Sequence, residues 1–272
     1  MINGNIDWSG GCGNLASAVL LFAKTCGLVP DTTTQARVWQ VNVKEEIQIV
    51  ERNDVVTIAG VPGRSKAIEL SFMGNPEKSL LPTGNVVDDL NGTTCTLIQG
   101  SNPTIFVSSI DPALPPQDAK ESEIDSWIEE IRRKGAQMMG IPCTDALRLS
   151  FVDKPRAYTD TTGRMVKEED HDIRARITAM AGGRRFHHAF TGTGSANLAI
   201  AFLIPGSVVN QTISAQASSP SVPFAERTVR IGHPGGVMDV TPRVEFHPSK
   251  GWRGSVKLVR TARLLMKGLV HA

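Results

Sequence analysis

The chain has 272 residues and a formal net charge of +2, with 40% hydrophobic and 21% charged residues. This balance suits a globular protein with a buried core, gives no bulk attraction for nucleic acid or membrane surfaces, and includes no apolar run long enough to span a bilayer. One Tyr and four Trp are too few to suggest a base-stacking platform, and four widely spaced cysteines without a C-x-x-C pair favour reduced thiols in the cytoplasm.

A glycine-rich turn followed by an apolar helix is the first predicted element. The turn Gly-Gly-Cys-Gly-Asn at 10–14 precedes the run 15–23, which is apolar all round and therefore predicts a helix buried on every face. The first N–H groups of a helix have no intrahelical partner and carry partial positive charge. Small residues let an anion approach them, so this helix start predicts a site for carboxylate or phosphate.

Short strands divided by Gly, Pro and Asn follow in the first half. A helix is then predicted from Ser122 to Met139, because Ile124, Trp127, Ile128 and Ile131 fall on one face. Its proline-rich approach predicts a crossing between two domains, residues 1–142 and residues 143–272. The strands are expected at 36–43, 46–51, 55–59, 67–72, 95–98 and 104–108.

The second half repeats this order around another glycine-rich turn. Thr-Gly-Thr-Gly-Ser at 191–195 opens a second apolar helix, which Pro205 and Gly206 end. Because position 197 is Asn, the pair Gly192 and Gly194 makes no dinucleotide fingerprint. The repeat predicts an α+β fold with strands around a central helix in each half. Further segments are a strand at 148–152, a mixed segment at 170–180, a lead-in at 186–190, strands at 228–231, 237–240, 243–247 and 255–259, and a C-terminal helix at 261–269 that returns to the first half.

Six motifs occur here in the order of a known family. They are Gly11-Cys12-Gly13-Asn14-Leu15, LLPTGN at 80–85, NPTIFV at 102–107, HHA at 187–189, RIGHPGG at 230–236 and RTAR at 260–263. Together they resemble the PrpF-type isomerases, which include 2-methylaconitate cis-trans isomerase, methylitaconate isomerase, aconitate isomerase and 4-oxalomesaconate tautomerase. The resemblance implies a diaminopimelate-epimerase-like fold, in which two pseudo-symmetric halves each wrap a curved mixed sheet around a central buried helix. It also implies proton transfer on a di- or tricarboxylate in the cleft, without a cofactor.

Three departures from the family pattern affect this expectation. Gly11 stands where members usually carry Asn, and Gly235 stands where they usually carry Ser. Members also have a segment before the Cys-Gly-Asn motif, with strands and a lysine thought to act as a base. The first half is therefore expected to be incomplete at its N-terminus. The alternative to an active isomerase is then a truncated or degenerate member that binds carboxylates without catalysis.

The catalytic candidate is Cys12. Shifting a double bond beside a carboxylate requires removal of a C–H proton and stabilisation of enolate-like charge. A thiol at a helix start, where thiolate is favoured, can shuttle or orient that proton, although the family's lysine is an alternative base and buried packing is the alternative role. Fold relatives that racemise use two opposed cysteines. Only one helix start here carries a cysteine, which disfavours epimerase or racemase activity.

The expected substrate ligands lie at both helix starts and in the other motifs. Arg260 is an alternative to Arg230 as the carboxylate ligand, and turn-forming roles are the alternatives for Asn102 and His233. No metal is expected, since adjacent His187 and His188 would face opposite sides of a strand, and the family resemblance implies that no cofactor is needed. The expected partner is a small polycarboxylate of undetermined identity, and a homodimer is left open. The proposed ligands are Gly13, Asn14, Asn102, His188, Thr193, Gly194, Ser195, Arg230, His233, Gly235 and Gly236.

Overall fold

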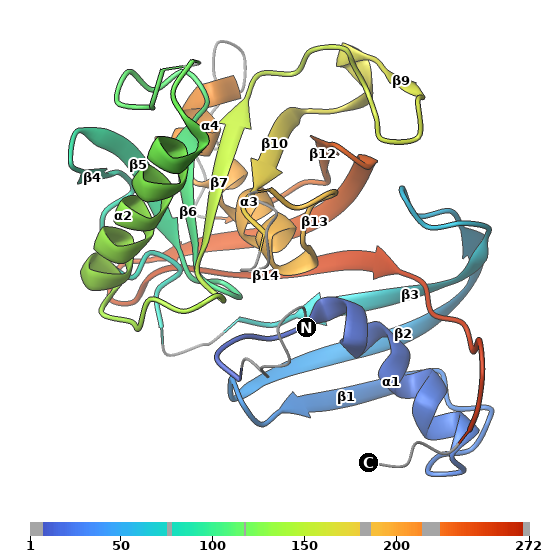
Figure 1. Ribbon diagram of the computed structural model, residues 1–272. Coiled ribbons are helices and arrows are strands. Elements are labelled where there is room, and N and C mark those ends of the chain that lie inside the picture. Colours follow the sequence, from blue (N-terminus) through green and yellow to red (C-terminus); the bar gives the residue numbers. More distant parts are fainter. Residues whose placement is uncertain (1–7, 75–77, 117, 180–185, 214–223, 269–272) are drawn as a thin grey trace.

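The structure is a computed structural model that describes residues 8–74, 78–116, 118–179, 186–213 and 224–268 (Figure 1). The helices are α1 (Gly13–Thr25), α2 (Glu121–Met139), α3 (Gly192–Leu203), α4 (Val208–Ile213) and the 3-10 turn η1 (Glu168–Asp170). The strands are β1 (Gln35–Gln40), β2 (Glu45–Val56), β3 (Ser65–Phe72), β4 (Asp88–Leu90), β5 (Thr93–Ile98), β6 (Thr104–Ser108), β7 (Arg148–Asp153), β8 (Tyr158–Thr159), β9 (Met165–Val166), β10 (Ile173–Ile177), β11 (Phe224–Glu226), β12 (Val229–His233), β13 (Gly236–His247) and β14 (Gly251–Arg260). Among these helices none has the length and apolar character that a membrane span requires.

One mixed sheet joins nearly all the strands. Its order is β1-β2-β3-β14-β13-β12-β10-β7-β6-β5-β4, with β11 beside β13, while β8 and β9 form a separate hairpin. Only the pairs β10–β12 and β6–β7 are parallel among the described neighbours. Strands of the predicted first half lie at both ends of this sheet, and strands of the second half lie between them. The division at residues 142 and 143 does not coincide with a gap in the sheet and stays a prediction from the sequence.

Helix α3 is buried on every face, as its sequence predicts. All residues from Thr193 to Leu203 are buried, and the helix packs against β12, β13 and β14. Its core partners include Val240, Val244 and Val256. A helix that is apolar on every face is stable only when neighbouring elements pack against every side. The curved sheet and α4 pack against α3 in this way. The first turn of α3 is thereby fixed in the interior.

Helix α1 differs from its prediction. Ala16 and Leu20 pack on the β1–β3 end of the sheet, but Leu15 is 72% exposed and Phe22 is 62% exposed. The prediction that both halves hold a helix buried on every face is therefore wrong for the first half as described. The physical reason is coverage, because β1, β2 and β3 form one layer against one side of α1 (Figure 1).

Four other predicted segments differ in detail. The separate strand at 55–59 is wrong because β2 continues to Val56 across an irregularity, and 237–240 and 243–247 are one strand, β13. Pro242 does not interrupt β13, where it lies opposite Val256. Residues 261–268 contain no helix, although they do return to the first half, where Lys267 Nζ lies 3.4 Å from the Thr25 carbonyl oxygen. Positions 180 and 269, the ends of two predicted segments, lie outside the described residues.

Candidate active site

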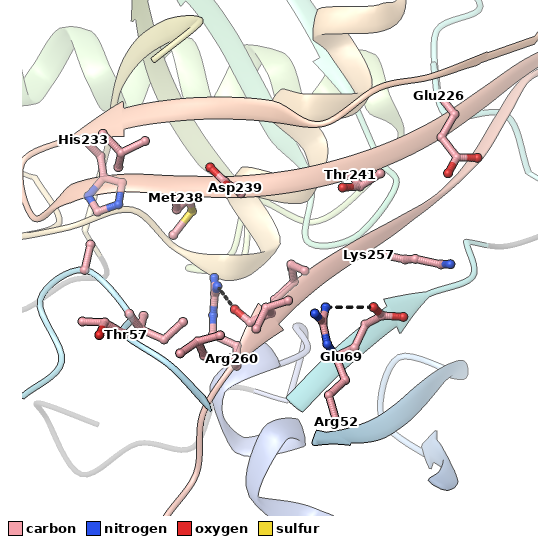
Figure 2. A pocket seen from close by; sticks show the side chains of 16 residues that line it. Arg52, Thr57, Glu69, Glu226, His233, Met238, Asp239, Thr241, Lys257 and Arg260 are labelled. Carbon is pink, nitrogen blue, oxygen red and sulfur yellow. Dashed lines mark hydrogen bonds and ion pairs between the residues drawn. The ribbon is translucent and has the colours of Figure 1, made fainter. Parts of the chain in front are cut away.

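A cavity of about 510 Å³ opens where β13 and β14 separate. The two strands are paired up to Val240 and Leu258, and beyond that point their facing residues line the cavity instead. Figure 2 shows His233 and Arg260 at the same end of this cavity with their side chains pointing toward each other. The walls carry mostly strand residues of the sheet, together with the segment that follows β2. The end of the cavity formed by His233 and Arg260 carries two buried polar side chains.

Arg260 is a buried cation, with only 8% of its surface exposed. Strand alternation places it on the same buried face as Val256 and Leu258. Its Nη1 donates to the Val259 carbonyl oxygen at 2.9 Å, and no described carboxylate lies within ion-pair distance. A Cβ on Gly192 would lie 3.2 Å from Arg260 Nη2, so the guanidinium adjoins the first residue of α3. Burial lowers the pKa of Arg260 to about 10, which leaves it charged at neutral pH.

His233 is a buried neutral donor beside this cation. Only 2% of it is exposed, and its Nδ1 accepts the Gly235 N–H at 3.1 Å, which assigns the ring proton to Nε2. That Nε2 has no hydrogen-bond partner among the described residues. Burial, followed by the charge of Arg260, lowers the pKa of His233 to about 4. An unsatisfied buried donor costs about 1–3 kcal/mol, so this N–H indicates a place for a ligand acceptor.

The start of α3 adds backbone donors to the same region. Thr191 caps the helix, since its Oγ1 accepts the Gly194 N–H at 3.0 Å and its carbonyl accepts the Ser195 N–H at 2.9 Å. Ser195 Oγ donates to the Gly192 carbonyl at 2.8 Å. Within the described chain, the N–H groups of Gly192 and Thr193 have no partner. Of the predicted residues Thr193, Gly194 and Ser195, the first therefore keeps an amide available for a ligand.

Cys12 is the exposed N-cap residue of α1, as its sequence position suggests. No side chain caps this helix, so the N–H groups of Gly13 and Asn14 have no partner among the described residues. Asn102 holds the preceding residue, because its Oδ1 accepts the Gly11 N–H at 2.8 Å and its Nδ2 donates to the Gly11 carbonyl at 3.2 Å. Helices α1 and α3 are in contact, although Cys12 does not line the His233 and Arg260 cavity.

The two glycines after His233 shape the turn that carries it. Gly236 has φ +125°, a conformation that favours glycine, and a Cβ on Gly235 would lie 3.2 Å from the His233 ring. Tyr158 Oη donates to this turn, with the His233 carbonyl at 2.9 Å and the Gly236 carbonyl at 2.6 Å. Burial raises the pKa of Tyr158 to about 12, so its hydroxyl stays protonated. The turn therefore orients His233 through backbone contacts.

Two predicted ligands lie elsewhere. Arg230 is three residues from His233 on β12 and so faces the opposite side of the sheet, where its Nη2 lies 2.9 Å from Asp172 Oδ1 and its Nη1 donates to Glu169. His188 is exposed and stacks on His187 with ring centroids 4.6 Å apart, so the expectation that these side chains face opposite sides of a strand is wrong, because the chain bends here and forms no strand. The structure thus brings Arg260, not Arg230, to His233.

The sequence contained a signal for Arg260. In the alternating segment 255–259, Val256 and Leu258 mark the buried face, and Arg260 is the next position on that face. A charged residue at a core position of a strand indicates a site. Lys257 and Asp239, which also line the cavity, gave no such signal because polar residues on the other face of a strand are ordinary. Within the described ranges, no three His, Cys, Asp or Glu side chains are placed to hold a metal ion.

The lowered pKa of His233 predicts a loss of stability in acid. The unfolded chain takes up this proton near pH 6.5 but the folded chain only near pH 4, so the stability is present above pH 6.5 and is lost as pH falls toward 4. Between about pH 7 and about pH 4.5, we expect His233 to account for roughly 2–3 kcal/mol of the decrease. Denaturant unfolding at both pH values measures it. His233→Gln is expected to be less acid-sensitive, and equal sensitivity would contradict the assignment.

Comparison with known proteins gives consistent results along the chain. A family model described as PrpF protein matches residues 2–272. The 2-methyl-aconitate isomerase of Shewanella oneidensis is 28% identical, with 98% of this chain and 74% of the relative covered. The 3-methylitaconate isomerase of Eubacterium barkeri is 29% identical, with 98% and 75% covered. The (4E)-oxalomesaconate Delta-isomerase of a Novosphingobium species is 29% identical, with 95% and 72% covered.

A solved structure of methylitaconate-delta-isomerase superposes with a TM-score of 0.69 at 25% identity, covering 95% of this chain and 72% of that one. This similarity confirms the predicted fold class. The expectation that the family's N-terminal segment is missing is not confirmed, because the family model matches from residue 2 onward.

Proposed function

The chain belongs to the PrpF family and is an isomerase, and from that premise we propose that it shifts a double bond, or changes cis-trans geometry, in a small unsaturated polycarboxylate by proton transfer. The observation that carries the proposal is a pair of donors at one end of the cavity: the His233 Nε2–H, which has no hydrogen-bond partner among the described residues, and the Arg260 guanidinium, which has no described carboxylate partner. The names of the relatives, which include methylaconitate and methylitaconate isomerases, support the substrate class.

The first step is the binding of one substrate carboxylate at the Arg260 end of the cavity. A planar guanidinium can bind both carboxylate oxygens, and His233 Nε2 donates to one of them. The free N–H groups of Gly192 and Thr193 at the positive end of α3 favour the same anion. Binding would pair a buried charge and satisfy a buried donor in one event, which favours an anion over a neutral ligand.

The second step is removal of a proton from the carbon next to the bound carboxylate. Cys12 Sγ takes the proton, and the electron pair of the broken C–H bond moves toward the carboxylate oxygens as an enolate-like charge. Arg260 and His233 stabilise that charge more strongly than the ground-state carboxylate, which is the condition for lowering the barrier. The thiol then returns the proton to the other end of the allylic system.

The proposed reaction balances within one substrate molecule. One proton leaves a carbon and returns to another, the double bond moves between them, and no atom is oxidised or reduced. It therefore needs no electron acceptor, which supports the proposed independence from a redox cofactor. The described cysteines, Cys12, Cys26, Cys95 and Cys143, are all free thiols, as a cytoplasmic location favours.

Hydrogen exchange tests the proposal directly. The protein is incubated with trans-aconitate or 2-methylaconitate in heavy water, and NMR monitors the substrate. We expect deuterium to be incorporated at the allylic carbon. Fumarate serves as the control because it has carboxylates and a double bond but no allylic C–H bond. Absence of exchange with every short unsaturated di- or tricarboxylate that has such a bond would overturn the proposed function.

A further inference from the structure

A fully buried amide connects α3 with the loop between β5 and β6. Asn197 has 0% exposure and lies in an otherwise apolar stretch of α3. Its Oδ1 accepts the Gly100 N–H at 3.1 Å and lies 3.2 Å from the Ser101 hydroxyl. Its Nδ2 donates to the Asn102 carbonyl at 2.7 Å and to Thr104 Oγ1 at 2.9 Å. The amide therefore uses its hydrogen-bonding capacity within one short loop.

The same loop reaches the start of α1. The Asn102 side chain both accepts from and donates to the backbone of Gly11, the residue directly before Cys12. Ser101 Oγ also lies 2.8 Å from the Thr193 carbonyl in the first turn of α3. One segment thus contacts the first turn of α3 on one side and the entry to α1 on the other.

Close backbone approach lets this connection form. A Cβ on Gly10 would lie 2.8 Å from Asn102 Nδ2, and a Cβ on Gly100 would lie 2.7 Å from Ile200 Cδ1. Both distances are too short for a side chain without movement of the neighbours, so glycine at these positions permits the contact. Gly11 is bound to Asn102 through its backbone N–H and carbonyl.

We propose that Asn197 is a positioning residue, which acts through Asn102 to fix the residue before Cys12 relative to the start of α3. The inference rests on the proposed function, in which Cys12 carries the proton while α3 and Arg260 hold the carboxylate. A buried polar network that is fully satisfied favours one arrangement of its members, because any shift leaves a donor or acceptor unpaired. Asn197 therefore fixes the start of α3 relative to the residue before Cys12, without contacting the substrate or the thiol.

Kinetics of two variants test the pathway. Asn197→Leu and Asn102→Ala are each expected to lower the kcat for deuterium exchange about tenfold or more, with KM for trans-aconitate changed less than about threefold. If both act through one connection, the double variant is expected to be no slower than the slower single variant. Multiplication of the two effects would overturn the proposal. Should Asn197→Leu fail to fold, Asn197→Asp replaces it, because aspartate keeps the shape and the acceptor oxygen but cannot donate to the Asn102 carbonyl.

Thiol alkylation tests the same pathway without relying on activity. Iodoacetamide labelling, resolved by peptide mass spectrometry, compares Cys12 with the exposed Cys26 and Cys143 in one sample. Because Asn102 holds Gly11, loss of this contact changes the backbone that positions Cys12, and the Cys12 alkylation rate is expected to change about threefold or more relative to the other two. An unchanged rate in both the Asn197 and Asn102 variants would overturn the proposal, even if the protein proved inactive.

Asn210 provides a matched control. It is another buried amide, in α4, with Nδ2 bonded to the Phe202 carbonyl at 3.0 Å and Oδ1 to the Gly206 N–H at 3.3 Å. Asn210→Leu is expected to lower the Tm by an amount similar to Asn197→Leu, while kcat and Cys12 alkylation change less than about twofold. If Asn210→Leu lowers kcat as much as Asn197→Leu, the loss reflects general stability and the proposal is wrong.

Discussion

Arg260→Met is expected to lower kcat/KM by about 10²–10³-fold while leaving the protein as stable as the unmodified chain, or more stable. The guanidinium is buried without a described carboxylate partner, so the free protein bears the desolvation of a charge. Methionine has a similar reach and fits beside Leu258 without that charge. Kinetics with trans-aconitate are expected to show the lower kcat/KM, and thermal unfolding an equal or higher Tm.

Arg230→Met is the matched control. The sequence makes Arg230 and Arg260 equal candidates for the carboxylate ligand, but only Arg260 lines the cavity with His233. Arg230 pairs with Asp172 at 2.9 Å on the other face of β12. Its loss leaves Asp172, a largely buried carboxylate, without this partner, so we expect a lower Tm with kcat/KM changed less than about threefold. Activity loss in Arg230→Met, or a large stability loss without activity loss in Arg260→Met, would contradict the assignment of the carboxylate site.

Local sequence patterns predicted most of the elements. The period of apolar residues located α2 and β1 because such a pattern reflects one face turned toward the protein, whereas a continuous apolar run located α3, which is buried on every face. The pairing of β3 with β14 joins segments about 190 residues apart, and no local pattern specifies it. The exposure of α1 has the same origin. Its apolar residues indicate a preference for burial, while the strands that cover it are set by the tertiary arrangement.

The candidate site shows a similar limit. The motifs indicated both helix starts and the turn around His233, but two arginines near strand ends looked equivalent until their faces were known. Only the alternation of buried residues before Arg260 distinguishes it from Arg230. In the sequence, Asn197 indicates only that the third glycine of a dinucleotide-binding motif is absent. Its four contacts come from a loop almost 100 residues earlier, so its role follows from tertiary structure alone.

Cys12→Ser is expected to lower kcat for deuterium exchange by about 10²–10⁴-fold, the usual contribution of a positioned proton-transfer group. A hydroxyl is a far weaker acid than a thiol, so serine cannot take the part of a thiolate base. The same change should not weaken the fold. Cys12 is the N-cap of α1 and makes no side-chain cap bond, whereas serine is a preferred N-cap worth about 0.5–2 kcal/mol over a residue that cannot cap.

The expected combination is therefore an equal or higher Tm with a nearly inactive enzyme. Cys26→Ser changes another exposed thiol, the C-cap at the opposite end of α1, and is expected to leave exchange within about twofold of the unmodified protein. A thiol that served only packing would give the reverse result for Cys12→Ser, with exchange retained. That outcome would assign the proton to another group while leaving the carboxylate site intact, because Cys12 lies at the start of α1 whereas His233 and Arg260 lie on β12 and β14.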